Sequence, residues 1–166
     1  MKKILILLFI FSLNNQVFAA GDGGGSSDSG SESSSTSQYD QAVKLVKRAG
    51  KLEQKDKGEK AKKLYSQAFK KLNKAYKTDK KNPNILNYMG FTSRKTGNFK
   101  EAENYYLAGL DLDPKHNGIN EYLGELYVQT DRIDKANERL AVLKNCDCEE
   151  YQDLELIIKT RGTKIY

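Results

Sequence analysis

The sequence predicts an all-α fold built from a stack of antiparallel helix pairs. From residue 39 onward, apolar residues recur at intervals of three and four, which is the spacing of one face of an amphipathic helix. No stretch alternates apolar and polar residues between hairpin turns, as strands would. Related residues also return 34 positions later, as in Met89-Gly90 and Leu123-Gly124. This period predicts that the helices form repeated pairs.

The first nineteen residues have the layout of a secretory signal peptide. Lys2 and Lys3 form a basic start, an apolar run follows over residues 4–13, and Ala19 supplies a small residue at the expected cleavage site. The apolar run is too short to span a bilayer, which needs about 20 residues. No cysteine follows it that could carry a lipid anchor. We therefore expect residues 1–19 to be removed and the mature chain to be periplasmic or secreted, with no transmembrane anchor.

Residues 20–38 consist almost entirely of Gly, Ser, Asp, Glu and Thr. Such a composition cannot bury enough apolar surface to offset the entropy lost on ordering, so a disordered, flexible linker is expected. Residues 39–166 have the length of one domain.

Within this domain, local signals place the helices in order. A first helix is expected over residues 39–52 and a second over the apolar stripe of residues 61–76. Asn82-Pro83 then suits a helix start, with Asn as the cap and Pro at the first helical position, and Asn98 has capping-box spacing to Glu101. The remaining helices are expected near residues 84–95, 99–111, 118–129, 133–145 and 149–160.

Aligning residues 83–116 with residues 117–150 pairs small residues with small ones. Gly90 matches Gly124 and Ala102 matches Ala136. We expect each glycine to lie where the two helices of a pair cross closely, because a larger side chain would hold them apart.

This pattern resembles the tetratricopeptide repeat (TPR) family. The signature is carried over residues 83–116 by Leu86, Met89, Gly90, Gly97, Phe99, Ala102, Tyr106, Leu110 and Pro114. It continues over residues 117–148 through Leu123, Gly124, Tyr127, Ala136 and Leu140, and a divergent repeat over 39–82 keeps Tyr65, Ala68, Leu72 and Ala75. The resemblance implies a right-handed stack of about three repeats, with residues 149–160 as a C-terminal capping helix.

The stretches NYMGF, SRKTGNF, NEYLGELY and LKNCDCEEYQDL also look like those of uncharacterised periplasmic TPR proteins of proteobacteria. That resemblance implies an interaction role in the cell envelope. In TPR stacks the first helices of the pairs line a concave groove that commonly takes a peptide, so we expect a non-catalytic scaffold that binds a protein or peptide of the envelope there. By register, the groove residues would be Asn84, Asn87, Tyr88, Phe91, Arg94, Lys95, Glu121, Tyr122, Glu125 and Gln129. Some TPR proteins clamp a C-terminal carboxylate with Lys and Asn, but Asn87, Phe91 and Tyr122 replace those residues here. Alternatively, Tyr88 and Tyr122 only pack between repeats.

Cys146 and Cys148 allow three interpretations of their chemical role. In an exported protein, two cysteines favour a disulfide, although a loop this short gains only about 1.6 kcal/mol from loop entropy. A redox or intermolecular thiol would make the chain a periplasmic thiol–disulfide factor. Soft-metal binding needs more ligands than two thiols, and the single histidine, His116, is expected in a turn. We therefore expect no metal site and no cofactor.

The charge of the chain is uneven. Residues 39–81 hold fifteen Lys and Arg against five Asp and Glu, whereas residues 82–166 carry a small negative excess. The basic region is either a solvated face or a contact for an anionic surface. Nucleic acid is disfavoured as a partner of an exported protein. The sequence also contains no Ser/His/Asp set, phosphate-binding glycine loop or metal-ligand cluster of the kind that enzymes use.

Overall fold

The computed structural model describes the backbone of residues 30–162 and the side chains of residues 37–162. The expected signal peptide and the first part of the expected linker lie outside the described residues. Within the described part all regular elements are helices, which confirms the all-α fold class. The helices are α1 (Gly30–Glu53), α2 (Gly58–Thr78), α3 (Pro83–Lys95), α4 (Phe99–Leu112), α5 (Asn117–Gln129), α6 (Ile133–Leu143) and α7 (Glu149–Lys159).

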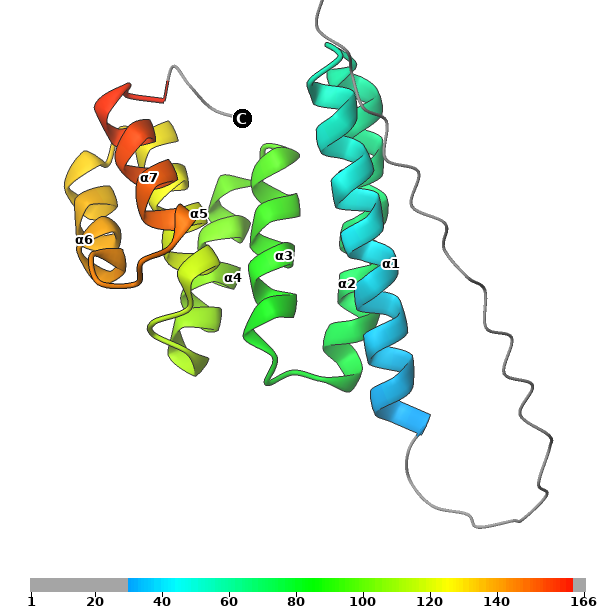
Figure 1. Cartoon of the computed structure of the whole chain (residues 1–166). Coiled ribbons are helices and arrows are strands. Elements are labelled where there is room, and N and C mark those ends of the chain that lie inside the picture. Colours follow the sequence, from blue (N-terminus) through cyan, green and yellow to red (C-terminus); the bar gives the residue numbers. More distant parts are fainter. Residues whose placement is uncertain (1–29, 163–166) are drawn as a thin grey trace, which may run out of the picture.

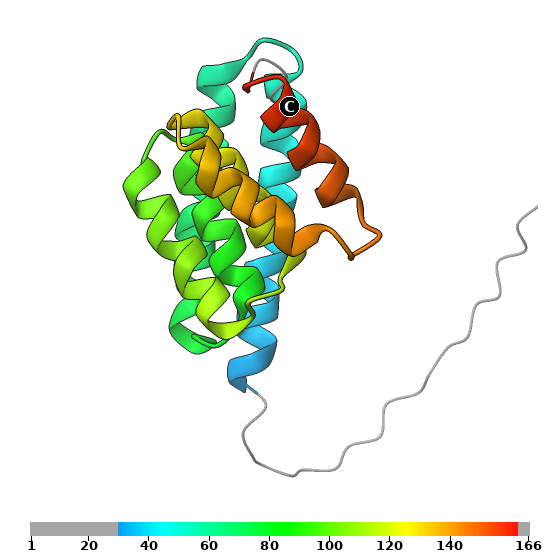
Figure 2. The ribbon, with the colours of Figure 1, turned by 90° about the vertical axis from the view of Figure 1, so that its left-hand side faces the viewer.

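The helices are stacked in chain order as neighbouring pairs. Figure 1 shows α1 and α2 at one end of the molecule, α3 and α4 in the middle, and α5, α6 and α7 at the other end. Short turns join the partners of each pair, and α7 packs against both α5 and α6. Figure 2 looks from the end formed by α6 and α7, with the other helices behind them. The stack therefore has two ends, one closed by α7 and one formed by α1 and α2.

Helix α1 is longer than the sequence predicts. It begins at Gly30, so residues 30–38 are helical where a disordered linker is expected. Extending a helix that is already nucleated adds one hydrogen bond for each residue that is fixed, whereas starting one is costly. The packing of α1 against α2 supplies the nucleus, and the absence of proline from residues 30–38 allows the helix to continue toward the N-terminus.

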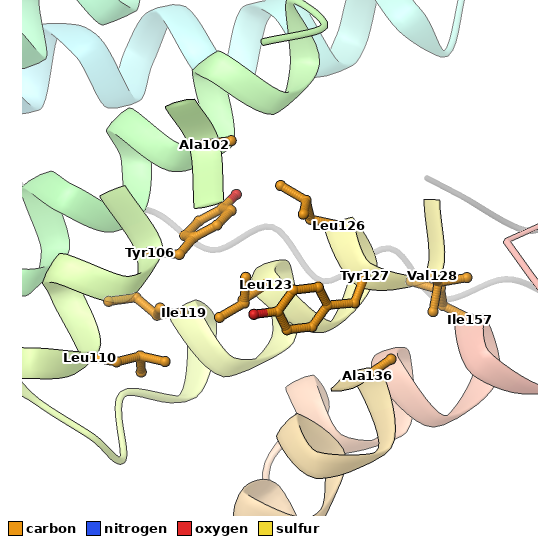
Figure 3. Packing of buried hydrophobic residues seen from close by; sticks show 10 residues of the cluster. All are labelled: Ala102, Tyr106, Leu110, Ile119, Leu123, Leu126, Tyr127, Val128, Ala136 and Ile157. Atoms are coloured by element: carbon orange, nitrogen blue, oxygen red, sulfur yellow. The ribbon is translucent and has the colours of Figure 1, made fainter. Parts of the chain in front are cut away.

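The core is built from side chains that join successive pairs. The largest cluster links α4, α5, α6 and α7, as Figure 3 shows. In it, Tyr106 of α4 packs with Leu123 and Leu126 of α5, and each of these side chains is fully buried. A second cluster joins α1, α2 and α3 through Ala42, Leu72 and Met89. Burial of each large apolar side chain stabilises the fold by about 1.5–3 kcal/mol, so every pair depends on its neighbours.

The two repeat-matched glycines meet different partners. A Cβ atom on Gly90 would overlap the ring of Tyr106 on α4, the other helix of its pair, as the sequence predicts. A Cβ atom on Gly124 would instead lie 2.5 Å from the side chain of Leu154 on α7. The closest approach to Gly124 is therefore made by α7, and not by α6 as the sequence predicts. The terminal helix α7 packs onto α5 and fills the space beside this glycine.

The expected helix starts are partly confirmed. Asn82 caps α3, because its side chain accepts a hydrogen bond from the Asn84 backbone N–H at 3.0 Å, and Pro83 follows at the first helical position. Asn98 precedes α4 but makes no side-chain capping bond. Its amide group donates to Thr96 Oγ1 at 3.3 Å instead, so the capping box expected between Asn98 and Glu101 does not form.

Candidate functional site

The candidate site is the surface where α3 and α5, the first helices of two successive pairs, lie next to each other. We call it the α3–α5 face and define it by Tyr88, Phe91 and Lys95 of α3 and Tyr122 of α5, all of which are partly buried. These residues share a face because the spacing within α3 is three to four residues, about one helical turn.

Aromatic rings connect the helices that meet at this face. The Phe91 ring lies between the rings of Tyr65 on α2 and Tyr122 on α5, with centroids 5.8 Å and 4.9 Å away. Tyr88 makes an edge contact with Tyr39 of α1, with centroids 5.7 Å apart. Aromatic pairs in such geometries are worth about 0.5–1.5 kcal/mol beyond their burial. The expected packing role of Tyr88 and Tyr122 between repeats is therefore present, and part of each ring still remains accessible.

A buried ion pair lies beneath these rings. Arg94 Nη1 of α3 is 2.5 Å from Glu125 Oε2 of α5, and Arg94 and Glu125 are only 4% and 5% exposed. The Arg94 guanidinium also lies 5.5 Å from the Phe91 ring centroid and 5.7 Å from that of Tyr122. The charges therefore neutralise each other within the protein and hold α3 and α5 in a fixed relation.

Glu121 adds a second buried carboxyl one turn before Glu125, and it is 8% exposed. Burial is the main reason why the pKa of Glu121 is raised from 4.5 to about 9. The negative charges of Glu125, Asp153 and Glu150 raise this pKa further, while Arg94 opposes them. At neutral pH Glu121 is thus a neutral carboxylic acid that can donate a hydrogen bond.

Lys95 is held at the edge of the face by the end of α1. Its Nζ atom lies 2.7 Å from Glu53 Oε2, and the same carboxylate oxygen accepts a hydrogen bond from the Tyr65 hydroxyl at 2.9 Å. The ammonium group also lies 5.7 Å from the Tyr65 ring centroid and 5.9 Å from that of Phe91. Lys95 is therefore part of the contact between the first two pairs, which the sequence gives no sign of.

The structure divides the ten residues expected in a groove into two groups. Four are buried: Asn87, Arg94, Glu121 and Glu125. The other six are partly or fully exposed and form the surface that a ligand could touch: Asn84, Tyr88, Phe91, Lys95, Tyr122 and Gln129. Burial of the first group reduces the accessible part of the site to aromatic and amide side chains with one lysine.

His116, expected in a turn, is the cap of α5. Its Nδ1 atom accepts a hydrogen bond from the Ile119 backbone N–H at 3.2 Å. Its Nε2 atom lies 3.1 Å from Asn84 Oδ1 at the start of α3, so the imidazole links successive repeats at one edge of the site. Burial lowers the pKa of His116, and the charges of Asp113 and Glu150 partly oppose this effect. The sequence offers no signal for this role, since histidine is an uncommon cap.

Cys146 and Cys148 are joined by a disulfide in the turn between α6 and α7. Cys148 is the residue that precedes α7, in agreement with the helix start expected there. Asp147 between them has a φ of 48°, a left-handed conformation that a non-glycine residue adopts at some cost. Of the three sequence alternatives, the local bridge is the one that the structure contains.

Residues 30–162, the described part of the chain, contain no group of three or more His, Cys, Asp or Glu residues placed to bind a metal ion. No helix in this part of the chain has both the length and the apolar character required to cross a membrane.

Comparisons with known proteins identify one repeat. No curated protein sequence matches the chain. Among solved structures, the chain is similar to SycD, the type III secretion translocator chaperone of Yersinia enterocolitica, in an alternative dimer, with 18% identity over 74% of this chain and 89% of that chain and a TM-score of 0.48. It is also similar to SycD in complex with a peptide of the translocator YopD, with 18% identity over 74% of this chain and 90% of that chain and a TM-score of 0.47.

A third similar structure is the second TPR of Spaghetti (RPAP3) bound to an HSP90 peptide, with 15% identity over 68% of this chain and 96% of that chain and a TM-score of 0.43. The family model for the tetratricopeptide repeat matches residues 83–116, which are α3 and α4 with their turns. Residues 83–116 therefore form a tetratricopeptide repeat.

Proposed function

We propose that this chain is a non-catalytic binding protein that docks a protein or peptide of the cell envelope against the α3–α5 face. One observation carries the proposal: the partly exposed residues Phe91 and Tyr122 lie with their rings against Arg94, whose buried ion pair with Glu125 joins the two helices that support them. Aromatic side chains supply much of the binding energy at protein interfaces. A face that is already rigid loses little entropy when a partner binds.

The chemistry of the face favours a polypeptide over a small charged ligand. Arg94 and Glu125 neutralise each other, and Lys95 is paired with Glu53. Asn84, an exposed residue at the margin of the face, carries an amide that can both donate and accept hydrogen bonds. Backbone amides of a peptide have the same two capacities, and the rings of the face offer an apolar surface.

We also propose that the protein acts after export, in the periplasm or as a secreted protein, as the layout of residues 1–19 indicates. The mass of the protein recovered from expressing cells tests this. A mature N-terminus at residue 20, in a periplasmic or secreted fraction, is the expected result. An intact N-terminus in the cytosolic fraction would exclude it.

Site-specific photo-crosslinking tests the binding face. A benzoylphenylalanine introduced at Phe91 keeps an aromatic ring at that position and extends it with a benzoyl group, and the matched control is the same residue at Asn104, an exposed position on α4. Crosslinked adducts with a protein or peptide of the cell envelope are expected from position 91 and not from position 104. A Tyr88→Ala substitution in the position-91 protein should reduce the adducts, with helix content measured by circular dichroism unchanged. Identical adducts from both positions would refute the proposal.

A second candidate function is thiol–disulfide exchange through Cys146 and Cys148. The observation that favours it is that the bridged cysteines are both partly exposed in a surface turn. In such an exchange the bridge is reduced to two thiols while two thiols of a partner are oxidised to a disulfide. The measurement is oxidation of a reduced model dithiol peptide by the full chain. Equal rates for wild type and a Cys146→Ser/Cys148→Ser variant would exclude this function.

A further inference from the structure

A groove lies along the seam between α1 and α2, the helix pair at one end of the stack. It has a volume of about 590 Å³, which is within the range of ligand-binding clefts. The residues that define it are Lys44, Leu45 and Arg48 of α1 and Lys70, Lys71 and Lys74 of α2. We call it the α1–α2 groove. Each helix contributes residues three and four apart, so one continuous stripe of each helix forms one side of the groove.

The charge of this groove is uncompensated by the protein. Five of its residues are cationic, and none of the five forms an ion pair with any residue of the described chain. Lys95 of the α3–α5 face and Arg94 beneath it, in contrast, are both paired. Between the charges, Leu45 and the methylene stems of the lysine side chains supply apolar surface. The groove therefore combines an apolar centre with positive charge on both sides.

The groove faces away from the rest of the stack. On the opposite side of α1, Tyr39 contacts Tyr88 of α3, and on the opposite side of α2, Phe69 contacts Tyr105 of α4. The α1–α2 pair forms one end of the molecule (Figure 1). At the other end, α7 packs on the preceding pair and covers it. The seam of α1 and α2 is thus a helix-pair surface that no described helix covers.

We propose that the α1–α2 groove docks an acidic amphipathic helix of a partner protein. A helix is the element that packs on helix pairs elsewhere in this stack, as α7 does on α5 and α6. Its apolar stripe would lie against Leu45 and the lysine stems, and acidic residues beside the stripe would pair with cations on both sides of the groove. A flat lipid surface would reach the outermost ammonium groups but not the apolar centre. A phosphate polymer would leave that centre unfilled.

The test uses the full chain and a synthetic acidic helix. The probe is a peptide about three heptads long with leucine along one stripe and glutamate beside it, and its scrambled isomer has the same composition without a stripe. Two variants with the same change in net charge are compared: Lys44→Glu/Lys71→Glu in the groove, and Lys100→Glu/Lys144→Glu at exposed positions outside it. Circular dichroism establishes that both variants keep the wild-type helix content.

The expected result is that the striped peptide binds and that the groove variant weakens this binding about tenfold or more, while the matched control keeps it within about twofold. The Tyr88→Ala variant should leave this binding unchanged, which separates the groove from the α3–α5 face. Equal binding of the scrambled isomer would overturn the proposal, because charge alone would then suffice. Equal losses in the two charge variants would overturn it for the same reason. Tighter binding to phosphatidylglycerol vesicles than to the striped peptide, lost in the groove variant, would assign the groove to a membrane instead.

Discussion

Arg94 and Glu125 form an ion pair between α3 and α5 in which both side chains are almost completely buried. Their positions are not equivalent in the repeat, since Arg94 corresponds to Val128 and Glu125 to Phe91 at the 34-residue period. The pair is therefore specific to the contact between these two units. It joins the repeat formed by residues 83–116 to the next pair and supports the rings of the candidate site.

Removing one partner of this pair should destabilise the protein strongly. Arg94→Met leaves the Glu125 carboxylate buried without its counter-ion, and loss of one member of a buried pair typically costs about 3–5 kcal/mol. Adding Glu125→Leu to Arg94→Met should recover part of this loss, because no charge then remains buried. Urea unfolding followed by circular dichroism measures both effects. The exposed pair Lys62–Glu59 is the control, and Lys62→Ala should change the stability by less than about 0.5 kcal/mol.

Glu121 should make the protein less stable as the pH rises. The pKa of Glu121 in the folded protein is about 9, against an ordinary value of 4.5. Between these two values the unfolded chain releases the proton and the folded protein keeps it, so stability falls as the pH rises through this range. Glu121→Gln removes the effect and should stabilise the protein by about 1–3 kcal/mol at neutral pH, with little change below pH 4.5.

Thermal unfolding across this pH range checks the prediction for Glu121. The Tm difference between Glu121→Gln and wild type should grow with pH. Asn104→Gln, which changes no titratable group at an exposed position on α4, is the control and should leave the pH profile as it is. A Tm difference for Glu121→Gln that is constant from acid to neutral pH would contradict the assigned burial of this carboxyl.

The sequence predicts the helices well because their signals are local. Asn82-Pro83 marks the start of α3 at the residue where it occurs, and the helices expected between residues 84 and 160 end within two residues of the observed ones. Gly90 is also predictable, because the repeat places a close helix crossing there and Tyr106 meets it. These features depend on neighbouring residues or on a regular period.

The candidate site is less predictable because it depends on how closely two helices approach. Periodicity puts Arg94, Glu121 and Glu125 on the same face as Phe91, but it does not tell whether that face is open at each position. In the folded stack all three charged side chains are buried. The contact of Leu154 with Gly124 is also not predictable from the sequence, because α7 lies outside the repeat and the 34-residue period therefore gives no register for it.

His116 should make the free energy of unfolding decrease at acidic pH. Its neutral ring accepts the Ile119 N–H at Nδ1, and protonation of that atom abolishes the bond. Because the pKa of His116 in the folded state is lowered from 6.5, its contribution is present above pH 6.5 and is lost as the pH falls through the lower, folded-state value. His116 is the single histidine of the chain, so NMR titration of its ring protons measures the pKa without ambiguity.

Two substitutions separate the capping role of His116 from its charge. Asn is a good cap that does not titrate, so His116→Asn should keep most of the stability and remove the loss on acidification below pH 6.5. His116→Ala should cost about 1 kcal/mol at neutral pH, which is typical for the loss of a cap. A ring that titrates at or above 6.5 in the folded protein would contradict the assigned capping geometry.

Two glycine-to-alanine substitutions should have opposite effects on stability. Both Gly50 and Gly90 lie inside helices, where alanine is intrinsically favoured by about 0.5–1 kcal/mol. At Gly50 no atom outside the adjoining residues of its own helix lies within 4 Å of the added Cβ. Gly50→Ala should therefore stabilise the protein by about 0.5–1 kcal/mol. At Gly90 the Cβ would overlap the buried Tyr106 ring, which must shift together with its neighbours in the core. Overpacking of this kind costs about 1–3 kcal/mol, and the net effect of Gly90→Ala should be a loss.

Chemical unfolding of the two alanine variants measures this difference, and a third variant identifies its cause. If the Tyr106 ring is the obstacle, Tyr106→Leu should weaken the protein alone but reduce the further cost of Gly90→Ala, because a leucine lacks the ring atoms that meet the Cβ. The stability lost in the double variant should therefore be smaller than the sum of the two single losses by more than about 0.5 kcal/mol, the limit within which independent sites add. Additive effects of the two substitutions would mean that Gly90 is required for a reason other than the crossing of α3 with α4.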